Sequence, residues 1–148
     1  MVLRAYVLII TGMFSFALSS MGEGKWTSYV STNDVQAMAV QGKYVWTGTP
    51  GSGAVRLDTG TGVRTRFTTA DGLVDDNVLS ITVDTQGAVW FGTNTYVSKF
   101  DGSSWKTYKA ELKGESVRDM AVDAKGAVWF ATDRKSTRLN SSHGKLTR

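Results

Sequence analysis

The chain has 148 residues, enough for one ordinary domain, and its 41% hydrophobic and 20% charged residues are typical of a globular protein. It has no cysteine and a single histidine, His143, which excludes disulfides, cysteine-based metal sites and, for residues 1–132, any mechanism that needs an imidazole. The net charge of +4 arises in residues 133–148, because the rest of the chain carries twelve basic and twelve acidic side chains, so we expect no nucleic-acid partner.

The N-terminal segment has the pattern of a secretory signal peptide. Arg4 precedes an apolar run from Ala5 to Leu18, and small residues follow this run. A run of about 14 residues is too short to cross the roughly 30 Å hydrocarbon core of a membrane as a helix. We therefore expect residues 1–22 to be a signal peptide, and the mature chain to have no stable membrane span. A buried N-terminal helix or a membrane anchor is the alternative interpretation.

The rest of the chain contains an internal repeat of about 40 residues. The strings GAVWFGT (87–93) and GAVWFAT (126–132) are nearly identical. Aligning their VW pairs with the pair at 45–46 places Trp46, Trp90 and Trp129 in register, 44 and 39 residues apart. Upstream of each pair stands another related string, in turn DVQAMAV (34–40), NVLSITV (77–83) and SVRDMAV (116–122).

Each repeat divides into four short segments that predict strands, because they are rich in Val, Thr, Trp, Tyr and Phe. The connections carry turn residues. Asp84 and Asp123 stand three residues before Gly87 and Gly126, as in a type I turn followed by a left-handed residue. Each repeat is therefore predicted to be a four-stranded antiparallel meander.

The predicted first strand of each repeat has one face of small residues, such as Ala37 and Ala39, and one of bulkier residues, such as Met38. Stacking the sheets face to face buries both. The sequence therefore predicts an all-β fold, a partial β-propeller over residues 24–132, whereas a β-sandwich would need no internal copy. It comprises two complete blades, half a blade and one orphan outer strand at Lys25–Tyr29. The predicted repeat core consists of Trp46, Trp90, Trp129, Val78 and Ile81.

Residues 68–108, TTADGLVDDNVLSITVDTQGAVWFGTNTYVSKFDGSSWKTY, resemble the two-component-regulator propeller repeat of bacterial extracytoplasmic sensor domains and secreted propeller proteins. The resemblance covers residues 24–132, and D-x-x-G-x-V-W-F-G-T is its most specific part. Ala131 departs from the pattern, since a glycine is usual there. The resemblance implies a bacterial, secreted or periplasmic module that binds or senses without catalysis, such as the sensor region of a two-component (hybrid histidine kinase) regulator.

Residues 133–148 do not continue the repeat pattern. DRKSTRLNSSH (133–143) has no apolar alternation, and it resembles the conceptual translation of a sequencing adapter. We expect a disordered or artefactual basic tail. We also expect the chain to be a fragment of a longer propeller protein, with further blades of that protein as its partners.

No motif for catalysis or for a cofactor is complete. The loop GTPGSGAV (48–55) has the spaced glycines of a phosphate-binding loop, but Ala54 and Val55 replace the required Lys and Ser/Thr. The neighbours Asp75 and Asp76 point apart in an extended segment, which disfavours an acid–base pair. We therefore expect no metal or other cofactor, and no enzyme.

Ligands of propellers commonly lie where the loops between blades and those between second and third strands meet. In this chain these loops are residues 49–53, 68–77, 93–96 and 109–116. The expected ligand is an unknown small molecule or carbohydrate. A secreted propeller enzyme, polysaccharide-active or lyase-type, and a cell-surface structural scaffold are the alternatives. The candidate contacts are Asp71, Asp75, Asn77, Asn94 and Tyr96.

Overall fold

The structure is a computed structural model of the chain. It describes residues 6–10, 13–18, 25–30, 34–109, 115–133, 136–140 and 145–147, with side chains in 34–109 and 115–133. The described residues form strands and one short 3-10 helix, and they contain no helix that is long and apolar enough to cross a membrane. The chain divides into two compact units, residues 1–34 and residues 35–148.

The first unit contains a three-stranded antiparallel sheet, β1 (Tyr6–Ile10), β2 (Met13–Leu18) and β3 (Lys25–Val30), in that order. The outer strand predicted at Lys25–Tyr29 is present as β3, but it pairs with β2 instead of standing alone. The two other strands lie in the predicted signal peptide. A short apolar run rich in Val, Ile and Phe suits a strand as well as a signal sequence, so the signal peptide stays a prediction. Its predicted end, residues 19–22, lies outside the described residues.

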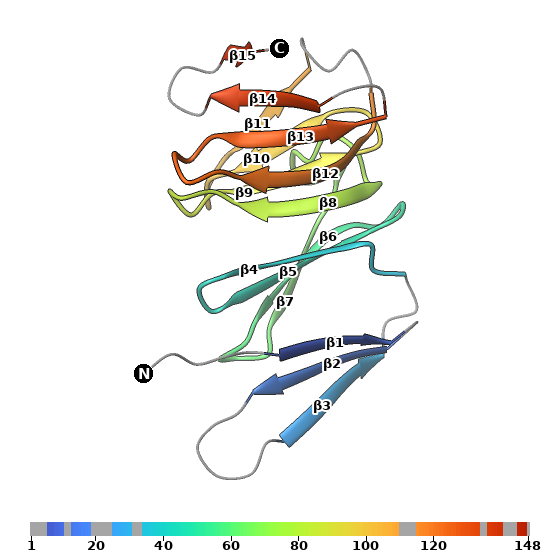
Figure 1. The fold of residues 1–148 in the computed structure, drawn as a ribbon. Coiled ribbons are helices and arrows are strands. Elements are labelled where there is room, and N and C mark those ends of the chain that lie inside the picture. Colours follow the sequence, from blue (N-terminus) through green and yellow to red (C-terminus); the bar gives the residue numbers. More distant parts are fainter. Residues whose placement is uncertain are drawn as a thin grey trace. The chain divides into compact units, whose positions relative to one another are not determined.

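The second unit contains three four-stranded antiparallel sheets, and in each the strands follow one another in chain order (Figure 1). Sheet I consists of β4 (Ala37–Gln41), β5 (Tyr44–Thr49), β6 (Gly53–Asp58) and β7 (Arg64–Phe67). After η1 (Thr69–Asp71), sheet II consists of β8 (Val78–Val83), β9 (Val89–Thr93), β10 (Val97–Phe100) and β11 (Trp105–Tyr108). Sheet III consists of β12 (Val117–Val122), β13 (Val128–Thr132), β14 (Ser136–Asn140) and β15 (Lys145–Thr147). The predicted fold class, an all-β partial propeller, is confirmed.

Sheet III has four strands where the sequence predicts two. Strand β14 pairs with β13, and β15 pairs with β14, within the residues expected to form a disordered or artefactual tail. The free edge of β13 offers a row of backbone N–H and C=O groups, which can pair with an extended segment whatever its side chains. Strand pairing of this kind leaves no apolar alternation in the sequence, and the repeat pattern therefore did not predict it.

The predicted turns are present, and each also fixes a tryptophan. The Asp84 Oδ1 atom accepts hydrogen bonds from the backbone N–H of Gln86 (3.0 Å) and Ala88 (2.8 Å), while Oδ2 accepts one from Trp90 Nε1 (2.8 Å). Gly87 closes this turn with a φ of 84°. Asp123 holds Trp129 Nε1 in the same way at 2.9 Å. In sheets II and III one aspartate thus couples the hairpin turn to the position of the indole ring, whereas in sheet I Trp46 Nε1 donates to Gln41 Oε1 at 2.9 Å.

The sheets meet face to face through aromatic rings. Trp46 of sheet I is fully buried, and its ring lies 5.4 Å from Phe91 and 5.8 Å from Phe100 of sheet II. Trp90 of sheet II is also fully buried, and its ring lies 6.1 Å from Phe130 of sheet III. Small residues complete the joint between sheets I and II, where Ala37 and Ala39 pack against a cluster that includes Val78 and Ile81. The expected pairing of a shallow face with a bulky one is confirmed.

Trp129 differs from the other two tryptophans. The sequence places it in the core, but 42% of it is exposed, whereas Trp46, Trp90 and Val78 are fully buried and Ile81 is 9% exposed. Trp129 is exposed because of the face of sheet III on which it lies. Trp129 points to the side of sheet III opposite sheet II, and no sheet of the second unit's described residues covers that side.

Two glycines occupy the closest approach between sheets. A Cβ atom on Gly92 would lie 2.8 Å from Val117 Cγ1 and 3.0 Å from the Val117 carbonyl oxygen, and it would collide with Ser80 Oγ. A Cβ on Gly48 would lie 2.5 Å from Val78 Cγ1. Both contacts are tighter than real Cβ contacts, so the sheets can approach this far only with glycine at these positions.

We expect Gly92→Ala to lower the free energy of unfolding by about 1–3 kcal/mol, because the added methyl group overpacks the joint between sheets II and III. Urea unfolding followed by circular dichroism measures the change. An unchanged urea midpoint would show that the joint relaxes freely, and that the glycine is not required there.

Candidate loop-edge site

The loops singled out by the sequence meet at one edge of the second unit. We define the loop edge as residues 49–53, 68–77, 93–96 and 115–116. The Gly53 backbone N–H of sheet I donates to the Asp76 carbonyl oxygen at 2.8 Å, and the Asn94 N–H donates to the Asn77 carbonyl oxygen at 3.2 Å. Residues 110–114 of the last predicted loop lie outside the described residues. The described loops therefore form one continuous edge across the three sheets.

Asp75 is the centre of the polar contacts on this edge. Its Oδ1 atom accepts hydrogen bonds from the backbone N–H of Asn77 (2.9 Å) and from Asn77 Nδ2 (3.1 Å). Its Oδ2 atom accepts one from Thr95 Oγ1 (3.1 Å), which lies in the loop between β9 and β10. The half-buried carboxylate thus ties the segment before β8 to a loop 20 residues away.

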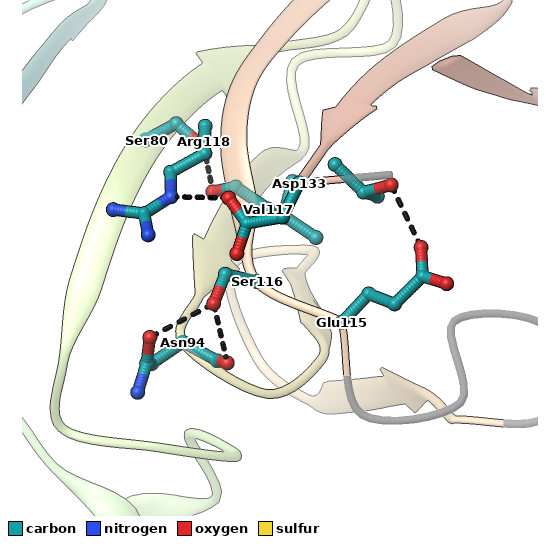
Figure 2. Close-up of polar contacts among 8 residues, drawn as sticks. Ser80, Asn94, Glu115, Ser116, Val117, Arg118 and Asp133 are labelled. Atoms are coloured by element: carbon teal, nitrogen blue, oxygen red, sulfur yellow. Dashed lines mark hydrogen bonds and ion pairs between the residues drawn. The ribbon is translucent and has the colours of Figure 1, made fainter. Parts of the chain in front are cut away.

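Asn94 extends the loop edge to sheet III (Figure 2). Ser116 Oγ lies 2.9 Å from Asn94 Oδ1 and 3.1 Å from the Asn94 carbonyl oxygen, and it donates to this pair of acceptors. Next to it, Ser80 Oγ donates to the Val117 carbonyl oxygen at 3.1 Å, so two hydroxyl groups bridge sheets II and III. Asn94 is exposed, which leaves its amide facing solvent at the centre of the edge.

Two of the five predicted contacts have local roles. Asp71 accepts from the backbone N–H of Thr68 (2.8 Å) and from Thr68 Oγ1 (3.0 Å), which caps the short helix η1. The ring of Tyr96 packs against the cluster around Trp90, and Lys109 Nζ lies 5.7 Å from its centre. The structure therefore brings Asp75, Asn77 and Asn94 together, and it engages Asp71 and Tyr96 elsewhere.

Thr95 and Ser116 belong to the same polar set but were not predicted. Ser116 was detectable, because the repeat alignment places it in register with Asn77, immediately before the first strand of its sheet. Thr95 carries no such signal, since its contact with Asp75 depends on the conformation of the loop. Loop contacts of this kind follow from the folded backbone and leave no periodic pattern.

The loop edge is suited to hydrogen bonding. It presents carboxylate and amide oxygens as acceptors and the Asn94 amide as donor. Asp76 is engaged by Thr69, whose backbone N–H donates to Asp76 Oδ1 at 2.8 Å. Within the described residues, no group of three or more His, Cys, Asp or Glu side chains is arranged to hold a metal ion. Hydroxyl groups of a ligand match this arrangement better than a cation does.

The opposite edge of the second unit carries a largely buried ion pair. Asp84 and Lys99 form an ion pair of 3.0 Å with side-chain exposures of 2% and 18%. Burial alone would raise the pKa of Asp84, but hydrogen bonds from Trp90, Lys99 and Ala88, together with the charge of Lys99, lower it below its ordinary value. This buried pair lies beside Trp90 of the same sheet and takes no part in the loop edge.

Asp101, in the turn between β10 and β11, has a lowered pKa, and this makes the stability of the fold depend on pH. The side chain and backbone N–H of Ser104 donate to its carboxylate, as do those of Ser103, and these bonds lower its pKa. A carboxyl group with a depressed folded pKa stabilises the fold above its unfolded pKa, and this contribution is lost as the pH falls below about 4. We expect the melting temperature to fall between about pH 5 and pH 2.5, and to fall less steeply in Asp101→Asn. Parallel curves for the two proteins would contradict this assignment.

Residues 72–95 match the family model described as "Two component regulator propeller". The chain carries a two component regulator propeller repeat. The matched segment contains Asp75, Asn77 and Asn94, so the loop edge is part of the repeat. No curated protein sequence matches the chain significantly.

Solved structures with the same fold include both extracellular domains of one and two component systems and a lyase. The extracellular domain assigned to a one component system, BT4673 of B. thetaiotaomicron, is similar over 98% of this chain and 22% of its own length, with 18% identity and a TM-score of 0.72. The extracellular domain assigned to a hybrid two component system, BT3049 of the same organism, is similar over 97% and 22%, with 19% identity and a TM-score of 0.70. Virginiamycin B lyase from Staphylococcus aureus is similar over 93% and 48%, with 20% identity and a TM-score of 0.73. The propeller-repeat chain thus spans about a fifth of the two extracellular domains and about half of the lyase.

Proposed function

We propose that this chain is part of an extracytoplasmic propeller module that binds a neutral carbohydrate or a similar hydroxylated molecule at the loop edge and has no catalytic activity. The propeller repeat and the likeness to extracellular domains of one and two component systems support a sensing role outside the bacterial cytoplasm. The predicted signal peptide at residues 1–22 agrees with secretion or a periplasmic location. Further blades of a longer propeller would complete the module.

The contact of Asp75, Asn77, Asn94 and Ser116 along one edge is the observation that carries the proposal. Carboxylate oxygens accept hydrogen bonds from sugar hydroxyl groups, and an exposed amide both donates and accepts. The carboxylates of Asp75 and Asp76 repel anions, so a neutral ligand fits this edge better than a phosphate or a sulfated sugar. The specificity would thus come from hydroxyl groups.

The competing function is a lyase, which the likeness to virginiamycin B lyase raises. Acid–base chemistry would need a side chain free to exchange a proton. The described carboxylates of the loop edge instead accept hydrogen bonds from other residues of the chain, Asp71 from Thr68, Asp75 from Asn77 and Thr95, Asp76 from Thr69, and Glu115 from Thr132. This arrangement favours binding over catalysis.

Calorimetry with neutral hexasaccharides of glucose, mannose and xylose tests the binding proposal. We expect one of them to bind, and Asn94→Ala to weaken its affinity about tenfold, since a lost hydrogen bond costs on the order of 1.4 kcal/mol. Ser116 keeps the backbone carbonyl of residue 94 as an acceptor, so the loop itself should stay in place. Asp101→Asn, at the opposite edge, is the matched control and should bind as the unchanged chain does.

Two results would overturn the proposal. If no hexasaccharide binds, or if Asn94→Ala binds as tightly as the unchanged chain, the loop edge is not a carbohydrate site. If the chain consumes virginiamycin B in a mass-spectrometric assay, the module is an enzyme. The two failures are distinguishable, because the first concerns binding and the second concerns turnover.

A further inference from the structure

The two joints between sheets share a contact pattern that can be followed residue by residue. In each joint a buried tryptophan of one sheet meets a phenylalanine of the next, as Trp46 meets Phe91 and Trp90 meets Phe130. Two residues further along the same strand, a glycine lies against the valine that begins the next sheet. These pairs are Gly48 with Val78 and Gly92 with Val117.

The strand beside each glycine carries a small residue, which leaves room for the next sheet. Ala37 pairs with Gly48, and Ser80 pairs with Gly92. The Ser80 hydroxyl donates to the carbonyl oxygen of Val117 at 3.1 Å, so this position can add a hydrogen bond across the joint. Alanine or serine here lets the next strand bring its carbonyl group close.

Sheet III repeats this register on its outer face but changes two residues. Ala131 stands in the position of Gly48 and Gly92, and Asp119 pairs with it in the position of Ser80. Asp119 is exposed, and its Oδ1 atom accepts a hydrogen bond from its own neighbour, the Met120 N–H, at 2.8 Å. A carboxylate cannot donate to a carbonyl oxygen, and the methyl group of Ala131 fills the space into which Val78 and Val117 fit in the other joints.

We propose that the outer face of sheet III, formed by Asp119, Ala121, Trp129 and Ala131, binds a further repeat sheet that differs from sheets II and III at two positions. The incoming sheet places a residue smaller than valine against Ala131, and it directs a hydrogen-bond donor toward Asp119. The occupant is a repeat sheet because the face continues two existing interfaces in register. Its tryptophan, which such a sheet covers completely in sheets I and II, is 42% exposed here.

A second copy of this chain fits the face poorly. In the repeat register its first sheet would bring Val35 against Ala131, where a valine is too large. It would also bring Asp34 to Asp133, because Ser116 meets Asn94 at the equivalent place and Asp133 is aligned with Asn94. Asp133 is already held by Arg118 in an ion pair of 2.7 Å, so the misfit of Val35 against Ala131 is what disfavours this occupant.

The test adds a sheet to the full chain. A copy of residues 68–109 is appended after Arg148, so that the copied Val78 would meet Ala131 and the copied backbone carbonyl would meet Asp119. Hydroxyl-radical footprinting then measures the labelling of Trp129. Trp46, which is fully buried and absent from the copied segment, is the internal control for folding of the chain.

We expect the unaltered copy to leave the labelling of Trp129 at the level of the chain alone. A copy with Val78→Ala and an added donor, Leu79→Lys, should bring Trp129 labelling down toward that of Trp46. The unaltered copy should gain the same protection when the chain carries Ala131→Gly and Asp119→Ser, which restore the pattern of the other joint. This rescue shows whether the residues at positions 119 and 131 select the incoming sheet, or whether the appended sheet simply fails to fold.

Three results would overturn the inference. If the unaltered copy protects Trp129 of the unaltered chain as fully as the matched pairs do, the two residues do not select the neighbour. If every combination leaves Trp129 labelled while Trp46 stays protected, the face does not bind a repeat sheet. Protection of Trp129 in the chain alone that grows with concentration would identify a second copy as the occupant.

Discussion

Replacing Trp46 with alanine should lower the free energy of unfolding by about 3–5 kcal/mol, the cost of removing a large aromatic side chain from a packed core. Trp46 is fully buried, and its ring lies within 5.8 Å of Phe67, Phe91 and Phe100, so the substitution leaves a cavity between sheets I and II. Urea unfolding followed by far-ultraviolet circular dichroism measures the loss without depending on tryptophan fluorescence.

Trp129→Ala is the matched control, because Trp129 has the same place in its repeat and its indole N–H also donates to a side-chain oxygen, that of Asp123, where Trp46 donates to Gln41. Its 42% exposure predicts a distinctly smaller loss, since less apolar surface returns to water when it is removed. If the two variants lose equal free energies of unfolding, the contribution of these tryptophans to stability comes from their repeat position. It would then not come from burial between sheets.

Asp84→Asn should be the second strongly destabilising change, with a loss of about 3–5 kcal/mol, because it removes one partner of a buried ion pair. The Asp84 carboxylate accepts bonds from two backbone N–H groups and Trp90 Nε1 as well as from Lys99. The variant leaves the Lys99 ammonium group, whose side chain is only 18% exposed, without its counter-charge. Urea unfolding at neutral pH measures the effect.

Two further variants decide whether the ion pair is the cause. Asp123→Asn changes the equivalent aspartate, which holds the exposed Trp129, and should cost less. Lys99→Met in the Asp84→Asn background should recover part of the stability, since it removes the unpaired charge while keeping an apolar stem. If the double variant is as unstable as Asp84→Asn alone, the loss comes from the turn bonds of Asp84 and not from the charge.

The loop edge and the outer face of sheet III have different proposed roles, one in binding a ligand and the other in binding a further sheet. The loop edge gathers the polar side chains proposed to bind a ligand, and its Asn94–Ser116 pair joins sheets II and III. The outer face of sheet III carries residues that select the next sheet. Substitutions at Asn94 and at Ala131 should therefore act on different measurements, the first on ligand affinity and the second on the protection of Trp129.

The sequence by itself determined the architecture, because the information that specifies it is periodic. Strand alternation and the turns at Asp84 and Asp123 are local, and the recurrence of the VW pair sets one sheet per repeat. The same pattern predicted that a shallow face of one sheet would meet a bulky face of the next. The same periodic placement correctly predicted the burial of Trp46 and Trp90.

Only the tertiary structure decided which of the repeated or polar residues share an environment. Trp129 follows the same local pattern as Trp46, and its exposure depends on whether a neighbouring sheet is present. Asp71 and Asp75 stand in one short loop, but Asp71 caps a helix beside it while Asp75 binds Thr95 20 residues away. Burial and long-range hydrogen bonds are properties of the packed sheets, and a local pattern specifies the strand without specifying its neighbour.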